Sequence, residues 1–262
     1  MKKIIPIIII SFFFTSCDWH LGKTSDMESL LDYGFSDQPT KDVSSTESTD
    51  SPSTFKSTGT KHLGMDISHW QGDIMAAYKA SNDLSFVICK ATGGDYFVDP
   101  DFRNNWNEIK EKGLIRGAYH FYLCAFDPIT QAEHFCTTIS DIDAKDIAPI
   151  LDIEQGSMSK DVSGEQMAED ILVFLKEVEK KTNRKPILYT DYAFAQEYLK
   201  SYEFANYDLW LAEYTTDGDT PMVPDVWKEK GYKIWQKSAS YHIDTKTVDL
   251  DQYSGPLSEI VK

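Results

Sequence analysis

Two acidic side chains stand close together at the end of one apolar segment. Asp152 and Glu154 close the run Ile147–Glu154, whose other residues are almost all aliphatic. A run this short and apolar is typical of a buried strand, on which side chains two positions apart share a face. The two Cα atoms are then roughly 6.5–7 Å apart, at ~3.3 Å per residue. Each carboxylate raises the pKa of the other and burial raises both, as at sites where a proton is moved. The alternative is a pair of solvated acids that opens a loop.

Further acids lie at or near the carboxyl ends of other apolar runs. Asp66 interrupts the run 63–68, and Asp249 lies in the run 247–251. In the latter, alternation places the aliphatic residues on one face and the acids on the other. Four acids in such positions are hard to attribute to chance, even in an acidic chain.

Aromatic residues accompany these acids. Rings stack on the CH faces of sugars while carboxylates bond their hydroxyl groups, so the combination favours a site for a sugar polymer, although each ring taken singly is more typical of a core. We interpret His69 and His120 as hydrogen-bonded structural residues, because no Ser or Cys nucleophile stands near them. The rings near predicted strand ends are Trp70, Tyr119, Phe121, Tyr189, Trp210, Tyr214 and Trp235.

Strand-like and helix-like runs alternate from Leu63 onward. Helices are predicted at 163–182, which starts with a capping-box pattern, and at 99–112, which stops before Gly113. This alternation predicts an α/β fold with eight parallel strands, a small, irregular TIM-like (β/α) barrel in which some helices are short or missing. An open doubly wound sheet is the alternative, and both architectures bind ligands at the carboxyl ends of their strands. The predicted strands are 63–68, 84–91, 114–123, 147–153, 186–190, 208–213, 231–236 and 247–251.

The N-terminal segment has the pattern of a targeting signal. Lys2 and Lys3 precede an apolar stretch too short to span a bilayer, which ends at a lipobox-like Cys17. We expect residues 1–17 to be a lipoprotein-type signal peptide with its lipidation cysteine, 18–61 a flexible Ser/Thr/Asp-rich tether, and 62–262 the catalytic domain. The protein would then be a membrane-anchored lipoprotein of the cell envelope, facing the periplasm or the surface. Plain secretion is the alternative.

Composition excludes several partners. The net charge is −16, and no basic cluster follows the N-terminus, which argues against nucleic acid. No Cys/His spacing matches a zinc site, and we expect no metal, no cofactor and a monomer. Cys89 lies in a predicted strand, where buried thiols are common. At least one of Cys89, Cys124 and Cys136 is left unpaired within the chain, and a Cys124–Cys136 bridge is one alternative.

Seven segments, taken together and in order, resemble one known family. The chain resembles glycoside hydrolase family 25, the lysozymes or N-acetylmuramidases, over residues 62–253. The matching segments are Gly64-Met65-Asp66-Ile67-Ser68-His69-Trp70-Gln71-Gly72, Phe86-Val87-Ile88-Cys89-Lys90-Ala91-Thr92, Arg116-Gly117-Ala118-Tyr119-His120-Phe121, Asp152-Ile153-Glu154, Leu209-Trp210-Leu211-Ala212, Ile234-Trp235-Gln236 and Val248-Asp249-Leu250-Asp251.

The resemblance implies hydrolysis of the β-1,4 bond between N-acetylmuramic acid and N-acetylglucosamine in peptidoglycan. Glu154 matches the general acid of the family, Asp152 the carboxylate that assists it, and Asp66 and Asp249 the acids that complete the catalytic face. The family is thought to retain anomeric configuration, with the substrate's own acetamido group as one candidate nucleophile. The residues expected to bind substrate are Tyr119, Tyr189, Trp210, Gln236 and Lys90.

One position departs from the family pattern. Where the family usually has Glu after Lys-Ala-Thr, this chain has Gly93. The position is expected at the end of the second strand, so a substrate contact is in question there. A non-catalytic peptidoglycan-binding lipoprotein is therefore the alternative function.

Overall fold

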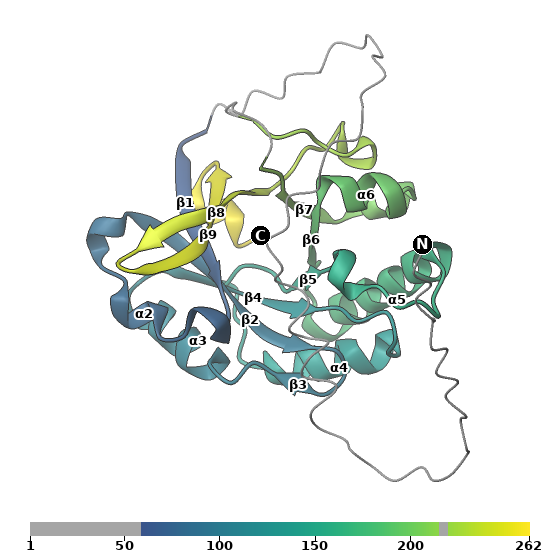
Figure 1. The fold of residues 1–262 in the computed structure, drawn as a ribbon, viewed down its shortest axis with the longest axis horizontal. Coiled ribbons are helices and arrows are strands. Elements are labelled where there is room, and N and C mark those ends of the chain that lie inside the picture. The colour runs from purple at the N-terminus through teal and green to yellow at the C-terminus, as the bar shows by residue number, and fades with distance from the viewer. Residues whose placement is uncertain (1–58, 215–219) are drawn as a thin grey trace, which may run out of the picture. The chain divides into compact units, whose positions relative to one another are not determined.

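A closed barrel forms the centre of the fold. The computed structural model describes residues 59–214 and 220–262. Within them, eight strands close a ring, because β1 pairs with both β2 and β9 (Figure 1). This closure confirms the barrel and excludes the open sheet, and every predicted strand overlaps one of the eight. They are β1 Lys61–Ile67, β2 Leu84–Gly93, β4 Ile115–Phe121, β5 Ile150–Asp152, β6 Ile187–Asp191, β7 Asp208–Ala212, β8 Ile234–Ile243 and β9 Lys246–Ser254.

The last strand runs against the others. Neighbours from β1 through β2, β4, β5, β6 and β7 to β8 are parallel, but β9 is antiparallel to both β8 and β1. The expectation that all eight strands are parallel is therefore wrong for β9. Only Asp244 and Thr245 separate β8 from β9. A parallel return needs a crossover of a dozen or more residues, whereas two residues suffice for a hairpin.

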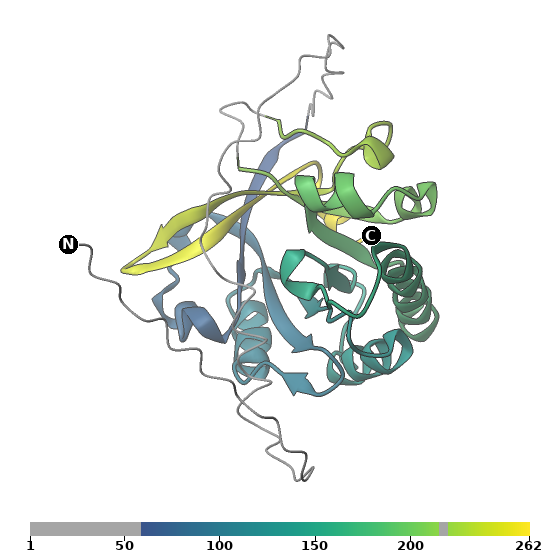
Figure 2. The same cartoon turned by 45° about the vertical axis from the view of Figure 1, so that its right-hand side comes forward.

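The helices are unequal, as the sequence predicted. The longer ones lie around the outside of the barrel (Figures 1 and 2). The helix predicted at 99–112 begins later, at Phe102, and it ends before Gly113, which adopts a φ of +76°. The helices are α2 Ile74–Ala77, α3 Phe102–Glu111, α4 Pro128–Thr138, α5 Gly164–Thr182, α6 Tyr192–Tyr198 and α7 Leu257–Ile260; the 3₁₀ turns are η2 His69–Gln71, η3 Ala80–Asn82, η4 Gln155–Ser157, η5 Tyr202–Asn206 and η6 Asp225–Trp227; and β3 is Phe97–Val98.

Helix α5 carries only half of its predicted capping box. The Ser163 hydroxyl accepts a hydrogen bond from the backbone N–H of Gln166 at 3.1 Å. The Gln166 side chain does not return to Ser163 but donates to Asp170 at 3.0 Å. The N-terminal turn is therefore capped from one side, which is enough to start the helix.

Alternation along the strands separates two apolar cores. One set of side chains packs between the barrel and the helices, with Met65, Val87 and Leu151 among them. The other set includes Phe86 and packs inside the barrel. At Gly64 a Cβ atom would lie 2.3 Å from the Phe86 ring, so only glycine fits beside that ring. This part of the barrel interior is apolar, and the polar side chains that face inward lie nearer the carboxyl ends of the strands.

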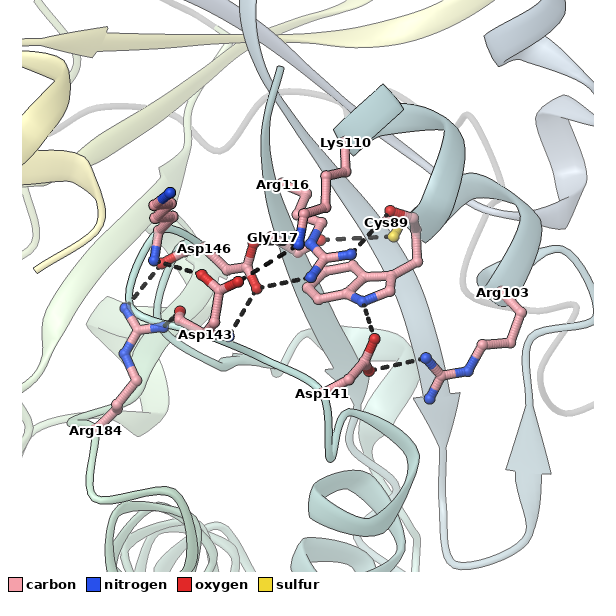
Figure 3. Close-up of polar contacts among 11 residues, drawn as sticks. Cys89, Arg103, Lys110, Arg116, Gly117, Asp141, Asp143, Asp146 and Arg184 are labelled. Carbon is pink, nitrogen blue, oxygen red and sulfur yellow. Dashed lines mark hydrogen bonds and ion pairs between the residues drawn. The ribbon is translucent and has the colours of Figure 1, made fainter. Parts of the chain in front are cut away.

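A buried ion pair holds the amino ends of the strands to α3 (Figure 3). Arg116 donates from Nε and Nη2 to the two carboxyl oxygens of Asp146 at 2.7 and 3.1 Å. Its Nη1 donates to the backbone oxygen of Trp106, and the guanidinium carbon lies 3.9 Å from the centroid of that indole ring. Arg184 donates to the backbone oxygens of Asp143, Asp146 and Val261, which ties the loop before β5 to the C-terminal segment.

Replacing Arg116 with methionine is expected to lower the free energy of unfolding by about 3–5 kcal/mol, because Asp146 would remain buried without its cation. Urea denaturation measures the change. Lys110→Met is the matched control, because the Lys110–Asp143 pair is exposed and exposed pairs contribute roughly 0–1 kcal/mol. Equal unfolding midpoints for the two variants would contradict this assignment.

Candidate active site

The structure brings the four predicted acids to one end of the barrel. Asp66 lies near the end of β1, Asp152 is the last residue of β5, and Glu154 follows β5 by two residues. Asp249 lies directly opposite Asp66 in the β1–β9 ladder. The sequence placed Asp249 near the carboxyl end of its strand, but it lies in the first half of β9. It still lies at the same end of the barrel as the other acids, because β9 runs antiparallel to its neighbours.

Glu154 keeps the direction of the strand that precedes it. Its backbone is extended, with φ −151° and ψ −175°, and its N–H donates to the Ser157 hydroxyl at 3.2 Å. The pKa of Glu154 is raised to about 7, mainly by burial and then by the charges of Asp191 and Asp249, while Lys90 opposes the rise. Asp191 thus acts on Glu154 in addition to Asp152, whose repulsion with Glu154 is mutual. Asp191 ends β6 and caps α6, so an acid at a strand end was the signal available for it.

Asp152 is 8% exposed and has a polar atom without a partner. Burial raises its pKa well above the ordinary value, the charge of Glu154 raises it further, and Lys90 lowers it. No group of the described residues forms a hydrogen bond with its Oδ1 atom. Because Asp152 and Glu154 interact, their protons belong to the pair, which loses them in two steps. The pair can therefore hold one proton when a solvated pair of acids would hold none.

Gln236 organises the side chains around Asp66. Its Nε2 donates to Asp66 Oδ2 at 2.6 Å. Its Oε1 accepts hydrogen bonds from the hydroxyl groups of Tyr189, at 2.9 Å, and of Tyr214. These bonds fix which way the amide points, because its nitrogen must face the carboxylate and its oxygen the two phenols.

The predicted aromatic residues divide into buried and exposed rings. Trp210 is only 2% exposed, with its ring centroid 6.4 Å from that of Tyr119 and 4.5 Å from that of Tyr189. Its Nε1 donates a hydrogen bond to Asp251 Oδ1 at 2.8 Å, so this side chain helps to fix the position of Asp251 inside the barrel. Phe121 and Trp235 are buried as well. Trp70 and Tyr214 are 47% and 50% exposed.

Lys90 lies beside the acids rather than at the surface. It is 5% exposed, and its Nζ lies 4.7 Å from the ring centroid of Phe121 and 5.8 Å from that of Phe97. Its charge lowers the pKa of both Asp152 and Glu154. The arrangement indicates that Lys90 balances part of the negative charge that the two acids bring into the barrel.

Replacing Lys90 with methionine is expected to raise the pKa values of Asp152 and Glu154, because the cation that favours their charged forms is removed. A ¹³C NMR titration of the carboxyl groups measures both values. Lys237→Met is the control, since Lys237 also lies over an aromatic ring, 5.0 Å from the centroid of Trp235, yet is not among the charges that shift either acid. Unchanged titration midpoints in Lys90→Met would show that Lys90 does not balance the pair.

The two histidines near the strand ends are hydrogen-bonded, as predicted. His120 is fully buried, with Nδ1 2.8 Å from the Thr92 hydroxyl and Nε2 3.2 Å from Gln131 Oε1. Burial lowers its pKa to about 3, so the ring is neutral. His69 Nδ1 lies 2.7 Å from Asp99 Oδ2, whose carboxyl is buried. Both rings therefore have structural partners.

Three further expectations concern cysteines, Gly93 and the N-terminus. Cys89, Cys124 and Cys136 are all free, so the alternative of a Cys124–Cys136 bridge is wrong. Gly93 is the last residue of β2, as expected, and pairs with Phe97 of β3. The signal peptide, Cys17 and nearly all of the predicted tether lie outside the described residues.

Two other features bear on ligands and membranes. A bilayer-spanning segment would need a long apolar helix, and residues 59–214 and 220–262 contain none. Over the same two ranges, no three His, Cys, Asp or Glu side chains are arranged to hold a metal ion.

Known proteins share this sequence and this barrel. The profile of the glycosyl hydrolases family 25 matches residues 65–245. Over 207 residues the chain is 32% identical to the uncharacterized protein YegX of Escherichia coli K12, an alignment that covers 75% of this chain and 71% of that protein. It is 30% identical over 197 residues to lysozyme M1 of Streptomyces globisporus, with 72% and 66% covered.

A solved lysozyme structure has the same fold. The bacterial lysozyme from Streptomyces coelicolor superposes with a TM-score of 0.68 and 27% identity, covering 79% of this chain and 97% of that one. Asp66, Asp152 and Glu154 lie within the range that the family profile matches, and Asp249 follows it by four residues. This chain belongs to glycosyl hydrolases family 25 and is a glycosidase.

Proposed function

We propose that this glycosidase is a lysozyme that hydrolyses the β-1,4 bond between N-acetylmuramic acid and N-acetylglucosamine in bacterial peptidoglycan. The observation that carries the proposal is the Asp152–Glu154 pair at the carboxyl end of the barrel, in which the pKa of Glu154 is raised to about 7. The similarity to lysozyme M1 and to the Streptomyces coelicolor lysozyme supports the choice of substrate.

Glu154 is the proposed general acid. A carboxyl group that keeps its proton near neutral pH can transfer it to the glycosidic oxygen as the bond to the leaving sugar breaks. The partial exposure of Glu154 supports this role, because the donor must reach a polymer that arrives from solvent.

Asp152 is the proposed partner of the reacting centre. As Glu154 gives up its proton, positive charge develops on the sugar, and a buried carboxylate beside it stabilises that charge. We assign to the Asp152 carboxyl, which is 8% exposed, a hydrogen bond from the acetamido group of the substrate. Such a bond would favour attack by the acetamido oxygen and a retaining, substrate-assisted course. Asp66 and Asp249 add negative potential at the same end of the barrel.

The proposed substrate-binding residues divide into exposed and buried side chains. We assign contact with the glycan to the partly exposed Tyr189, and add the half-exposed rings of Trp70 and Tyr214. Gln236, Tyr119, Trp210 and Lys90 are nearly buried, and we assign them to the support of the acids from within.

We also propose that the enzyme works outside the cytoplasm, where peptidoglycan lies. The lipobox-like Cys17 supports a lipid anchor, and the polar composition of residues 18–61 supports a tether that lets the domain 62–262 reach the wall. The acidic character of the chain supports the absence of nucleic acid among its partners, and a monomer remains our proposal.

Digestion of purified peptidoglycan tests the proposal. Mass spectrometry of the products should show new reducing ends at N-acetylmuramic acid, which identifies both the bond that is cut and the sugar at the new terminus. Wild-type protein that binds cell walls in a pull-down but releases no new reducing ends would instead support the non-catalytic binding protein that Gly93 raises as an alternative. Products that end in N-acetylglucosamine would contradict the proposed bond.

A further inference from the structure

A second pair of carboxyl groups lies deeper in the barrel than Asp152 and Glu154. Asp251 of β9 is opposite Gly64 of β1, whereas Asp249 is opposite Asp66. Asp251 therefore faces the interior one step below Asp249, diagonally across the ladder from Asp66. Diagonal neighbours on one face of an antiparallel pair come within reach of one another. Asp251 is fully buried and Asp66 is 6% exposed.

One oxygen of each carboxyl accepts a hydrogen bond, and the second oxygen of Asp251 accepts none. Asp66 Oδ2 accepts from Gln236 Nε2 at 2.6 Å, and Asp251 Oδ1 accepts from Trp210 Nε1 at 2.8 Å. Asp251 Oδ2 is buried and accepts no bond from any N–H or hydroxyl group of the described residues. A buried carboxylate oxygen without a donor is costly, unless a proton on a neighbouring carboxyl supplies one.

We propose that Asp66 and Asp251 share one proton, held between the oxygens that Gln236 and Trp210 do not engage. Asp66 and Asp251 are diagonal neighbours on one face of the β1–β9 ladder, within reach of a carboxyl–carboxyl hydrogen bond, and two carboxyls can form such a bond only if one of them is protonated. The shared proton reduces the charge of the pair from −2 to −1 in a region that excludes water. Paired carboxylates of this kind hold a proton well above the pH at which a solvated acid loses it.

The surroundings favour the proton. Burial raises the pKa of both Asp66 and Asp251, and so does the repulsion of Asp249. Asp152 adds to the repulsion on Asp66 from β5. No cation is among the groups that act most strongly on either carboxyl, in contrast to Asp152, which has Lys90 beside it. The phenols whose own pKa values are raised by Asp66 are those of Tyr119, Tyr189 and Tyr214.

The shared proton makes Asp251 a positioning residue. It orients Asp66, whose carboxyl accepts a hydrogen bond from the Gln236 amide nitrogen. The amide oxygen of Gln236 in turn accepts hydrogen bonds from the hydroxyl groups of Tyr189 and Tyr214. Hydrogen bonds thus connect the buried Asp251 to two tyrosines that we propose to contact the glycan. The effect on turnover rests on the proposed function, whereas the shared proton does not.

A ¹³C NMR titration of Asp-labelled protein tests the shared proton directly. In the wild type, the carboxyl resonances of Asp66 and Asp251 should titrate together in two steps, the upper one far above the ordinary Asp value of ~3.9. In Asp251→Asn the amide can accept from Trp210 and donate to Asp66, so Asp66 should titrate alone, with its midpoint lowered by at least one pH unit. Independent titrations in the wild type, or an unchanged Asp66 midpoint in Asp251→Asn, would overturn the proposal.

Kinetics test the positioning role with Asp251→Leu, which can neither accept from Trp210 nor donate to Asp66. Its kcat on glycan strands should be at least tenfold below that of Asp251→Asn. Equal kcat values for the two variants would overturn the positioning role. If Asp251→Leu does not fold, the titrations of the wild type and Asp251→Asn decide the proposal. Wild-type protein that cannot cut peptidoglycan would overturn the proposed function instead, and the titration result would be unaffected.

Discussion

Replacing Glu154 with glutamine is expected to lower kcat/KM on peptidoglycan strands by about 10²–10⁴-fold, the range in which a positioned general acid contributes to catalysis. Glutamine matches the size of the side chain but has no proton to give to the leaving oxygen. In the wild type, kcat/KM should fall as pH rises through about 7, where Glu154 loses its proton. Wild-type turnover in Glu154→Gln would exclude Glu154 as the acid.

Stability provides the control for this variant. The pKa of Glu154 is raised on folding, so the folded state holds its proton between the ordinary Glu value of ~4.3 and about 7. Between these limits the folded state binds more protons than the unfolded state, and stability due to this group falls as pH rises. Urea denaturation should therefore find Glu154→Gln as stable as the wild type at low pH and more stable above pH 7. A variant that is less stable at every pH would assign its loss of activity to misfolding.

Replacing Asp152 with asparagine is expected to lower kcat by about 10²–10³-fold, as does the loss of one preorganised electrostatic group. The amide keeps the shape of the side chain but lacks the charge that faces the developing cation. Because Asp152 and Glu154 interact, the alkaline limb of the kcat/KM profile should also move to lower pH. A kcat within a factor of about three of the wild type would contradict the role of Asp152.

Asp191→Asn is the matched comparison. Asp191 raises the pKa of Glu154, so its removal should also move the alkaline limb to lower pH. Asparagine is as good a helix N-cap as aspartate, so α6 should keep its first turn. The two variants then differ in whether the lost charge faces the reacting sugar. Equal losses of kcat in both would show that the effect of Asp152→Asn arises only through Glu154.

These results depend on how the barrel uses its two ends. At the amino end of β4, Arg116 pairs with Asp146 and packs against Trp106 (Figure 3), whereas the carboxyl end of the barrel gathers several acids. Charge at the first end has a partner of opposite sign. At the second, burial and then mutual repulsion raise the pKa values of Asp66, Asp152, Glu154 and Asp251, and Lys90 opposes the rise only at Asp152 and Glu154.

Local sequence was sufficient for the elements and for the main acids. Runs of five to ten residues predicted all eight strands, and the helical stripe at 163–182 predicted α5. The alternation around Asp152 and Glu154 placed both on one face, because side-chain direction in a strand depends on only the next residues along the chain. The order of segments such as Asp152-Ile153-Glu154 was enough to indicate the family.

The direction of β9 and the neighbours of each acid were decided by tertiary structure. The sequence predicted that Asp152 and Glu154 raise each other's pKa, but it did not single out Asp191 or Asp251. It also could not show that Lys90 and Trp210 are buried. A pKa depends on burial and on charges brought near from other strands, and hydrogen bonds such as Gln236 to Asp66 join residues 170 positions apart. Spacing along one strand determines which way a side chain points, but only the closing of the barrel determines what it meets.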